Sequence, residues 1–485
     1  MKKTIVIYDD VMQPNKEIKS ITGDKSYGET IFKRVTLKDR IKQEVLKNKA
    51  VSTFLVIEKI ERIEKLKEDL ISQINPADQT AIVYMYSNYG LADTKEFQTL
   101  LSKASYADQI YLASCDGQVA AVLLPDVNTC MTKLGALANR QVQGKEIENQ
   151  IFTDLSVIGN FLNFITGGFD ARFFNALLGD THTVTKRSTK KEKIKAEYEF
   201  YYLLPDNMKM WFVMPYDYRE DEQGASYTME RFHMTDIAIR FVHGAVSTDE
   251  LSDILDKLFY FINLRERKAV DAKTMKAVAD ELYIKKPENR MADLKKLPEY
   301  AYFDTMIRMG SDYDSIDDVV KTYEDLYEKV NKLYQVKEHQ LVIGHGDLCF
   351  SNILYSREAS LLKLIDPKGA LTKEELYTDP YYDLAKLSHS ICGSYDFFNT
   401  GLYQITIERD MKLKLSIDTD AQGYIEVFKT YLEKNGFSYT KVRLLEAGLF
   451  LSMLPYHMDQ PGKVFGFLLN AIRILEEVKK ECTRI

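Results

Sequence analysis

The segment from Leu341 to Leu354 constrains this 485-residue chain more than any other part of its sequence. It is a short apolar run followed by a polar loop, His-Gly-Asp-Leu-Cys-Phe-Ser-Asn, that ends at Asn352. A second apolar run, 361–365, leads directly into Asp366. Apolar runs of this length, bounded by polar turn residues, are typical of buried strands. Two short strands flanking the loop would bring Asn352 and Asp366 side by side.

The polar residues of this segment are the types that phosphoryl transfer requires. A carboxylate must orient the acceptor hydroxyl and accept its proton, and Asp347 fits that role. Oxygen ligands must hold the Mg²⁺ ions that bridge the phosphates of ATP, and Asn352 and Asp366 fit that role. The spacing H-x-D-L-x-x-x-N is that of the kinase catalytic loop. Loops also favour Asp and Asn for ordinary turn chemistry, but turn chemistry does not require this spacing between two strands.

A β-rich region upstream supplies candidate groups for nucleotide binding. A hairpin with a Gly179-Asp180 turn is predicted over 173–186, and Lys186 at its end is placed to reach the α- and β-phosphates. Glu197, in the helix predicted from 190 to 204, is the expected partner of that lysine. Glu199 of the same helix is the competing candidate.

Two further segments are candidates for holding the nucleotide. Gly167 and Gly168 precede the hairpin and would place backbone N–H groups over the phosphates, with a plain turn as the alternative. The run 227–232 is predicted to be a strand. Its part 227–231, which contains Met229 and Arg231, would form the hinge between two lobes, where backbone groups meet the adenine. An edge strand is the alternative there.

The order of the predicted elements divides the chain at about residue 150. Within the predicted domain 1–150, residues 1–130 alternate short apolar runs with amphipathic stretches, which predicts an α/β domain with a largely parallel sheet. A polar helical connector is predicted over 131–160. The connection after the first strand, 9–14, lacks glycine, and the chain contains neither G-x-G-x-x-G nor G-x-x-x-x-G-K-[ST], so no phosphate loop is predicted there. Residues 151–485 would form a second domain, with a β-rich lobe over about 160–232 and a helical lobe over about 233–485. A strand is expected over 210–214.

Charge and cysteine content exclude several classes of partner. Lys plus Arg number 65 against 72 Asp plus Glu, a net charge of −7, which argues against nucleic-acid or anionic-membrane binding. The five cysteines are irregularly spaced without a C-x-x-C pair, so neither disulfides nor a zinc site are predicted. No apolar run approaches the roughly 20 residues that span a bilayer, and the first residues do not form a signal peptide. We therefore expect a cytoplasmic protein, and its oligomeric state stays open.

From about residue 160 to its end, the chain resembles the aminoglycoside phosphotransferase and choline kinase family of kinase-like enzymes. The matching segments are H-G-D-L-C-F-S-N (345–352), I-D-P-K-G (365–369) and D-P-Y-Y-D-L-A (379–385). With the following K-L-S-H, the set is similar to phosphotransferase modules of bacterial capsule and surface-polysaccharide biosynthesis. The resemblance implies a bilobal α+β protein-kinase-like domain, with supporting roles for His345, Asp379 and Asp383.

Two departures from protein kinases indicate a small-molecule acceptor. Gly346 stands where protein kinases carry an arginine that pairs with a phosphorylated activation loop. Only twelve residues separate Asp366 from Asp379, which leaves little room for a peptide-docking segment. Aromatic residues after 380 permit a cage for a quaternary ammonium group, and a sugar or polyol held by hydrogen bonds is equally open.

The sequence therefore predicts ATP- and Mg²⁺-dependent phosphorylation of a hydroxyl on a sugar, polyol or amino alcohol, in capsule or surface-polysaccharide biosynthesis. One alternative is a bifunctional protein whose N-terminal domain is related to nucleotidyltransferases or glycosyltransferases; the missing glycine-rich loop counts against it. The other alternative is a nucleotide-binding pseudokinase scaffold. The joint presence of Lys186, Asp347 and the two candidate metal ligands argues against that scaffold.

Overall fold

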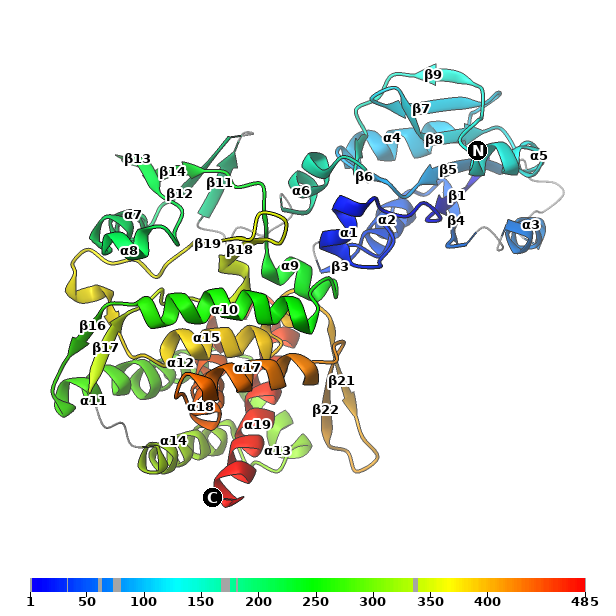
Figure 1. Cartoon of the computed structure of the whole chain (residues 1–485). Coiled ribbons are helices and arrows are strands. Elements are labelled where there is room, and N and C mark those ends of the chain that lie inside the picture. The colour runs from blue at the N-terminus through cyan, green and yellow to red at the C-terminus, as the bar shows by residue number, and fades with distance from the viewer. Residues whose placement is uncertain are drawn as a thin grey trace. The chain divides into compact units, whose positions relative to one another are not determined.

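The computed structural model describes residues 2–32, 34–59, 63–72, 80–166, 175–179, 182–334 and 339–484. Their contacts divide the chain into two compact units, 1–170 with 243–245, and 171–242 with 246–485. Figure 1 labels the elements of both units.

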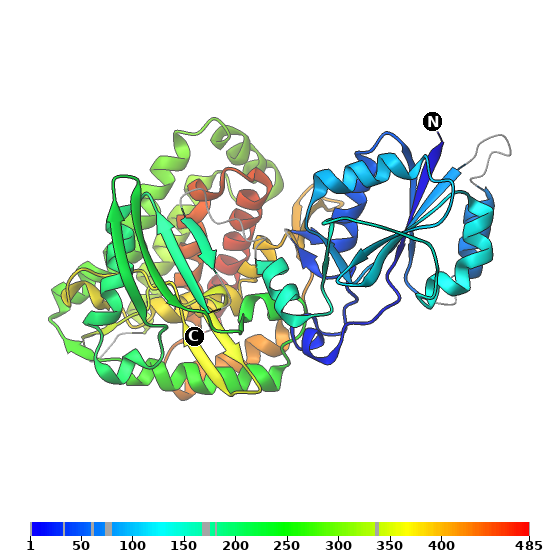
Figure 2. The same ribbon diagram turned by 90° about the horizontal axis from the view of Figure 1, so that it is seen from above.

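The first unit is built on a six-stranded mixed sheet with the order β4-β1-β5-β8-β7-β9. β1 is parallel to both β4 and β5, and all but the first residue of β1 is buried, as expected for a central strand covered on both faces. α2 packs with α4, and α3 with α5, so helices cover both faces of the sheet (Figure 2). The strands are β1 (Lys3–Asp9), β2 (Ile31–Phe32), β3 (Val35–Thr36), β4 (Val51–Ile57), β5 (Thr80–Tyr86), β6 (Tyr89–Leu91), β7 (Tyr111–Cys115), β8 (Gln118–Leu124), β9 (Lys145–Ile147) and β10 (Phe152–Asp154). The helices are α1 (Lys16–Thr22), α2 (Leu37–Leu46), α3 (Ile63–Ser72), α4 (Thr94–Ala104), α5 (Val127–Ala138) and α6 (Ile158–Thr166).

Two features of this unit differ from the prediction. The sheet is mixed rather than largely parallel, because β7 and β8 are joined by the two-residue turn Asp116-Gly117, whose positive φ values of 50° and 77° fit a tight hairpin. The predicted helical connector is wrong beyond Ala138. There β9 adds to the edge of the sheet beside β7, and β10 pairs with β6.

The second unit begins with a four-stranded antiparallel sheet in the order β11-β12-β14-β13. Helix α7 packs against this sheet, and its Ile194 shares a small buried cluster with Tyr227 of the sheet. Gly179 pairs with Val184 and is therefore part of the strand, not of the predicted turn; residues 180 and 181 lie outside the described ranges. The strand predicted over 210–214 is wrong, because a helical turn (α8) that buries Met208 displaces the strand to β13. The elements are β11 (Asn175–Gly179), β12 (Thr183–Ser188), α7 (Lys191–Leu203), α8 (Asp206–Lys209), β13 (Pro215–Asp221) and β14 (Gly224–Glu230).

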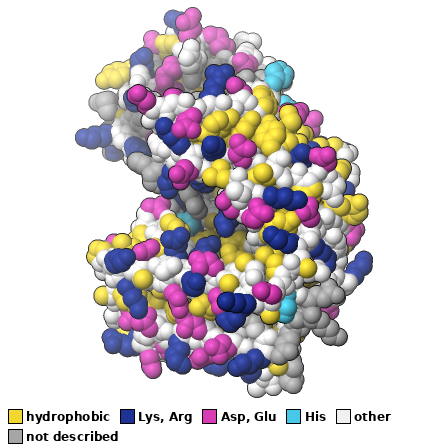
Figure 3. All heavy atoms as spheres, turned by 90° about the vertical axis from the view of Figure 1, so that its left-hand side faces the viewer, with side chains coloured by type: hydrophobic (Ala, Val, Ile, Leu, Met, Phe, Trp, Pro, Cys, Tyr) yellow, Lys and Arg dark blue, Asp and Glu magenta, His cyan; other side chains and the backbone are white. Residues whose placement is uncertain are grey.

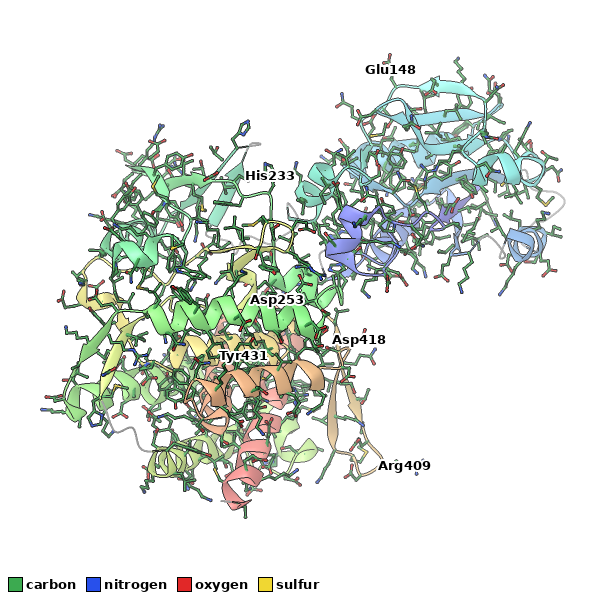
Figure 4. All side chains as sticks on the ribbon, viewed as in Figure 1. Glu148, His233, Asp253, Arg409, Asp418 and Tyr431 are labelled. Atoms are coloured by element: carbon green, nitrogen blue, oxygen red, sulfur yellow. The ribbon has the colours of Figure 1, made fainter. Side chains whose placement is uncertain are left out.

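The rest of the second unit is a helical lobe packed around α18, a helix with thirteen of its fifteen residues buried. A helix that is buried all round lies inside a core, and α12, α14, α15 and α19 surround this one. At the surface α17 packs along α10, where the Tyr431 hydroxyl donates to the carboxylate of Asp256 at 2.6 Å (Figure 4). The helices are α9 (Ile237–Val242), α10 (Thr248–Leu264), α11 (Ala272–Asp280), α12 (Lys286–Lys295), α13 (Tyr300–Gly310), α14 (Ile316–Leu333), α15 (Tyr382–Ile391), α16 (Tyr395–Asn399), α17 (Gln422–Lys434), α18 (Tyr439–Met453) and α19 (Pro461–Arg484), with the shorter turns η2 (Glu281–Lys285), η3 (Phe350–Asn352), η4 (Glu374–Leu376) and η5 (Leu454–His457).

Short strands in this lobe frame the predicted polar loop. They form the three-stranded sheets β15-β18-β19 and β16-β17-β20 and a separate hairpin, β21-β22, which the sequence analysis missed. Their bounds are β15 (Thr235–Asp236), β16 (Arg267–Ala269), β17 (Gln340–Ile343), β18 (Ile353–Ser356), β19 (Leu361–Leu364), β20 (Tyr377–Thr378), β21 (Tyr403–Ile407) and β22 (Leu413–Ile417). The predicted order of an α/β domain followed by an α+β domain, whose β-rich part precedes a helical part, is thus confirmed. Among the described helices, none combines the length and apolar character that crossing a bilayer would need.

The loop after β17 is fastened to α15 by the buried carboxylate of Asp383. It accepts the backbone N–H groups of His345 at 2.9 Å and Gly346 at 2.8 Å, and it lies 3.0 Å from the guanidinium of Arg265. The side chains of Asp383 and Arg265 are 0% and 1% exposed. One carboxylate therefore holds the loop, the start of α15 and the end of α10 together.

Replacing Asp383 with Asn should destabilise the protein by about 3–5 kcal/mol, because the buried guanidinium of Arg265 would lose its counter-charge. Chemical denaturation of the purified variant measures the change. Asp206→Asn serves as the control, since this exposed carboxylate pairs only with the neighbouring Lys209, and we expect its midpoint to stay that of the parent chain. Equal midpoints for the Asp383 variant and the parent would refute the anchoring role.

Candidate active site

The loop between β17 and β18 presents the Asp347 carboxylate to solvent, with 43% of the side chain exposed. Behind it the buried imidazole of His345 accepts the Asp347 N–H at Nδ1, lies 2.9 Å from the Ile365 carbonyl oxygen through Nε2, and stacks on Phe212. Burial lowers the pKa of His345, so its ring is neutral. These contacts hold the loop in place and leave Asp347 as the accessible acidic group.

Asn352 lies beside Asp347 at the end of the same loop. Its side-chain amide donates to the Asp347 backbone carbonyl at 2.8 Å and to the Asp347 carboxylate at 3.2 Å. Because the NH₂ group is used in this way, the carbonyl oxygen of the amide faces away from Asp347 and is available as a ligand.

Asp366 lies two residues after the end of β19, and the pairing of β18 with β19 brings its backbone next to Asn352. The Ile365 N–H donates to the Asn352 carbonyl at 3.0 Å. Asp366 has a φ of 56°, in the left-handed region that non-glycine residues rarely adopt, and its side chain is 45% exposed. Such a conformation persists where the surrounding structure enforces it, often in a functional site. The juxtaposition of Asn352 and Asp366 expected from the sequence is present.

Lys186 of β12 joins the two lobes through a chain of ion pairs. Its ammonium group lies 2.7 Å from the Glu197 carboxylate on α7 and 2.6 Å from the Asp366 carboxylate. Lys186 and Glu197 are buried, whereas Glu199 lies near tyrosines of the small lobe instead. Burial raises the pKa of Glu197 against the effect of the ammonium, and the two carboxylates raise the pKa of Lys186 against the effect of burial. Of the two glutamates considered, Glu197 is the one that contacts Lys186.

A lysine that the sequence analysis did not single out contacts Asp347. The ammonium of Lys386, on α15, lies 2.9 Å from the Asp347 carboxylate. The partly buried surroundings of the carboxylate work to raise the pKa of Asp347, but this ammonium outweighs them and lowers the pKa to about 2. Lys386 follows Asp383 by three residues, so both side chains lie on one helix face. The sequence signal that pointed to Lys386 is this three-residue spacing from Asp383, the second aspartate of the D-P-Y-Y-D-L-A segment.

The remaining predicted nucleotide contacts are only partly described. Gly167 and Gly168 lie outside the described residues. Met229 is part of β14, which continues to Glu230 and pairs with both β12 and β13, so the run 227–230 is a strand, as predicted, but not the edge strand of the alternative. A contact of the 227–231 backbone with the adenine stays a prediction. Met229 lines a small cavity behind the ion-pair chain. Arg231 is the first residue after the strand, and its backbone N–H donates to the His182 carbonyl at 2.9 Å.

The donor set fits Mg²⁺ held together with a nucleotide. Mg²⁺ is usually bound through one or two protein oxygens plus substrate phosphates rather than by a cage of protein ligands. Asp366 offers a carboxylate and Asn352 an amide oxygen, and strand pairing brings their backbones together. The described residues contain no cluster of three or more His, Cys, Asp or Glu side chains suited to a metal ion. Cys349 is buried with a raised pKa, so it is not a thiolate ligand.

A cavity of about 750 Å³ borders the loop on the side of Gly344 and Gly346. Lys368 and Gly369, which follow Asp366, line the same cavity. This volume is in the range of small-molecule sites. The site therefore combines an accessible carboxylate, two oxygen ligands, a buried lysine and an adjoining space for a ligand.

Neither a protein-family model nor a curated protein matches the chain. Among solved structures it is similar to aminoglycoside phosphotransferase APH(4)-Ia in ternary complex with AMP-PNP and hygromycin B, at 11% identity over 65% of this chain and 97% of that chain, with a TM-score of 0.36. It is also similar to ADP-bound aminoglycoside phosphotransferase APH(2'')-Ib, at 13% identity over 66% and 98%, with a TM-score of 0.34. A third is APH(3'')-Id from Streptomyces rimosus with ADP and streptomycin, at 15% identity over 61% and 97%, with a TM-score of 0.30.

Proposed function

We propose that the chain is a kinase that transfers the γ-phosphate of ATP to a hydroxyl group of a small molecule. The observation that carries this proposal is the ion-pair chain Glu197–Lys186–Asp366, which ends beside Asn352 and Asp347. A nucleotide kinase needs a cation for the phosphates, oxygens for the metal and a carboxylate for the acceptor. The chain offers a candidate for each: Lys186 for the phosphates, Asn352 and Asp366 for the metal, and Asp347 for the acceptor.

In the proposed reaction the acceptor oxygen forms a bond to the γ-phosphorus while the bond from that phosphorus to the β-phosphate oxygen breaks, releasing ADP. Asp347 orients the acceptor hydroxyl and takes its proton. Lys386 keeps Asp347 ionised and fixes the direction of its carboxylate. Lys186, held by Glu197, neutralises the α- and β-phosphates. Asn352 and Asp366 would hold Mg²⁺, which supplies charge neutralisation to the phosphates.

The acceptor is proposed to be a sugar, polyol or amino alcohol. The stretch between Asp366 and Asp379 is too short to dock a polypeptide, and the adjoining cavity has the size of a small-molecule site. The similarity to surface-polysaccharide modules supports a role in building such polymers, in the cytoplasm where ATP is available. A pseudokinase scaffold is the competing outcome of the experiments below.

Asp347→Asn should lower turnover by roughly 10²–10⁴-fold, because the amide accepts no proton from the acceptor. Nucleotide affinity should change little, since Asp347 does not contact Lys186 or Asp366. ADP release with a panel of sugars, polyols and amino alcohols measures turnover, and the rise in melting temperature with ATP and Mg²⁺ measures binding. If no acceptor stimulates ADP release and the substitution leaves the basal rate unchanged, the scaffold explanation prevails.

Lys186→Met should abolish turnover and also destabilise the fold by about 3–5 kcal/mol, because it leaves the Glu197 carboxylate buried without its main partner. The double variant Lys186→Met/Glu197→Gln separates the two effects, since it removes the cation and the buried charge together. We expect the double variant to regain most of the lost stability in chemical denaturation while ADP release stays absent. A double variant that regains turnover would contradict the role of Lys186 as the phosphate cation.

Lys386→Met should add an acid limb to the pH profile of kcat. The parent enzyme needs ionised Asp347, whose pKa is about 2, so this group limits its rate only at very low pH. Without the ammonium, burial raises the Asp347 pKa, and activity is lost at a higher pH as the pH falls. Measurements of kcat from pH 5 to pH 8 check this, with Lys386→Arg as the charge-preserving control. Superimposable profiles for the parent and the Met variant would refute the pairing.

A further inference from the structure

The carboxylate of Glu197, which holds Lys186, is itself held by more than that lysine. Its side chain is 2% exposed, so its oxygens need donors from within the protein. Among the described residues, Oε2 accepts from the Lys186 ammonium at 2.7 Å and from the Tyr227 hydroxyl at 3.2 Å, and Oε1 lies 3.5 Å from the half-exposed ammonium of Lys193. Surface charges of both signs are mixed on this side of the molecule (Figure 3), so these close contacts dominate the surroundings of Glu197.

The register of the sheet places Tyr227 beside Lys186. Tyr227 on β14 is the direct cross-strand partner of Lys186 on β12, and residues opposite each other in antiparallel strands carry their side chains on the same face. Helix α7 covers that face, where its Ile194 shares a buried cluster with Tyr227. Lys186 and Tyr227 therefore reach the same oxygen of Glu197 from two adjacent strands.

The Tyr227 hydroxyl serves this carboxylate as a donor. Tyr227 is buried, and its burial, together with the charges of Glu197 and Asp366, raises the pKa of its hydroxyl well above the usual value. The phenol therefore stays protonated under assay conditions and gives its proton to the hydrogen bond with the carboxylate. Hydrogen bonds to a charged group are stronger than those between neutral groups.

The hydroxyl has no room to contact a nucleotide directly. The cavity that borders Tyr227, Glu197 and Asp366 has a volume of about 20 Å³, which is enough for about one water molecule. An effect of this hydroxyl on nucleotide binding must therefore pass through Glu197 and Lys186.

We infer that Tyr227 is a positioning residue for the phosphate-binding lysine: its hydroxyl fixes the Glu197 carboxylate, which in turn fixes the ammonium of Lys186. This inference rests on the proposed function and assigns a further residue to the same site. When phosphates draw the ammonium away from Asp366, Glu197 is the carboxylate that still holds it. The hydrogen bond from Tyr227 then keeps Oε2 directed at β12.

Tyr227→Phe removes the hydroxyl and keeps the ring. KM for ATP should rise roughly 10-fold, because the loss of one hydrogen bond to a buried charge loosens the carboxylate that holds Lys186. The rise in melting temperature with ATP and Mg²⁺ should shrink accordingly. KM for the acceptor should stay that of the parent. A loss of folded protein alone would lower the apparent kcat and leave both KM values unchanged.

Tyr218→Phe is the matched control. Tyr218 packs on the same aromatic cluster, but its hydroxyl donates to Glu220 at 2.9 Å and not to Glu197. We expect both KM values of this variant to equal those of the parent, and chemical denaturation records the stability of both variants.

A double-mutant cycle with Glu197→Gln shows whether Tyr227 acts through Glu197. In the Gln background, replacing Tyr227 should change KM for ATP by less than about threefold, because the charge that the hydroxyl fixes is already gone. If the two effects multiply in full, or if Tyr227→Phe behaves like Tyr218→Phe while turnover depends on Asp347, the inference is wrong and the proposed function stands. If no acceptor raises ADP release above that of Asp347→Asn, the proposed function fails and this inference with it.

Discussion

The buried carboxylate of Asp383 is the constraint on which the candidate site depends. It accepts two successive backbone N–H groups of the loop and pairs with Arg265, so three distant parts of the chain share one charge. Together with the hydrogen bonds of the His345 ring, this anchor holds the backbone next to Asp347. The same helix face carries Lys386, which sets the ionisation of Asp347. Backbone position and carboxylate charge are therefore both controlled from one turn of α15.

A second electrostatic feature spans the lobes. The β-rich lobe contributes Lys186 and Glu197, and the helical lobe contributes Asp366. The buried end of this chain, at Glu197, is shielded from water, whereas Asp366 is nearly half exposed. The buried ion pair with Glu197 therefore fixes the lysine, whereas the ion pair with Asp366 stays accessible to a ligand. This asymmetry suits a site that must be preformed on one side and exchange partners on the other.

The part of the site that is local in sequence could be predicted, and the part that depends on packing could not. Asn352 and Asp366 lie on either side of a hairpin, so strand pairing alone brings them together. The contact between Lys386 and Asp347 depends on how α15 packs beneath the loop, which no spacing near Asp347 reveals.

The fold shows the same division. The central strands β1, β5 and β8 are mostly apolar and were recognised, whereas the Asp116-Gly117 turn that reverses β7 into β8 was overlooked although it is a strong hairpin signal. β21 and β22 alternate polar and apolar residues and were missed within a region that is otherwise helical. The displaced strand near 215 reflects the burial of Met208, a tertiary contact that overrides the local pattern.

The ion pair between Asp366 and Lys186 bears on the order in which a metal ion and a nucleotide would bind. One carboxylate oxygen of Asp366 is already bonded to the Lys186 ammonium, so a bare divalent ion would have to compete with that cation for a half-neutralised ligand. Under the proposed function, a metal ion bound to a polyphosphate would bring its own anions, and these would give the ammonium a new partner. The pairing would therefore favour binding of metal and nucleotide as a single complex over capture of the free ion.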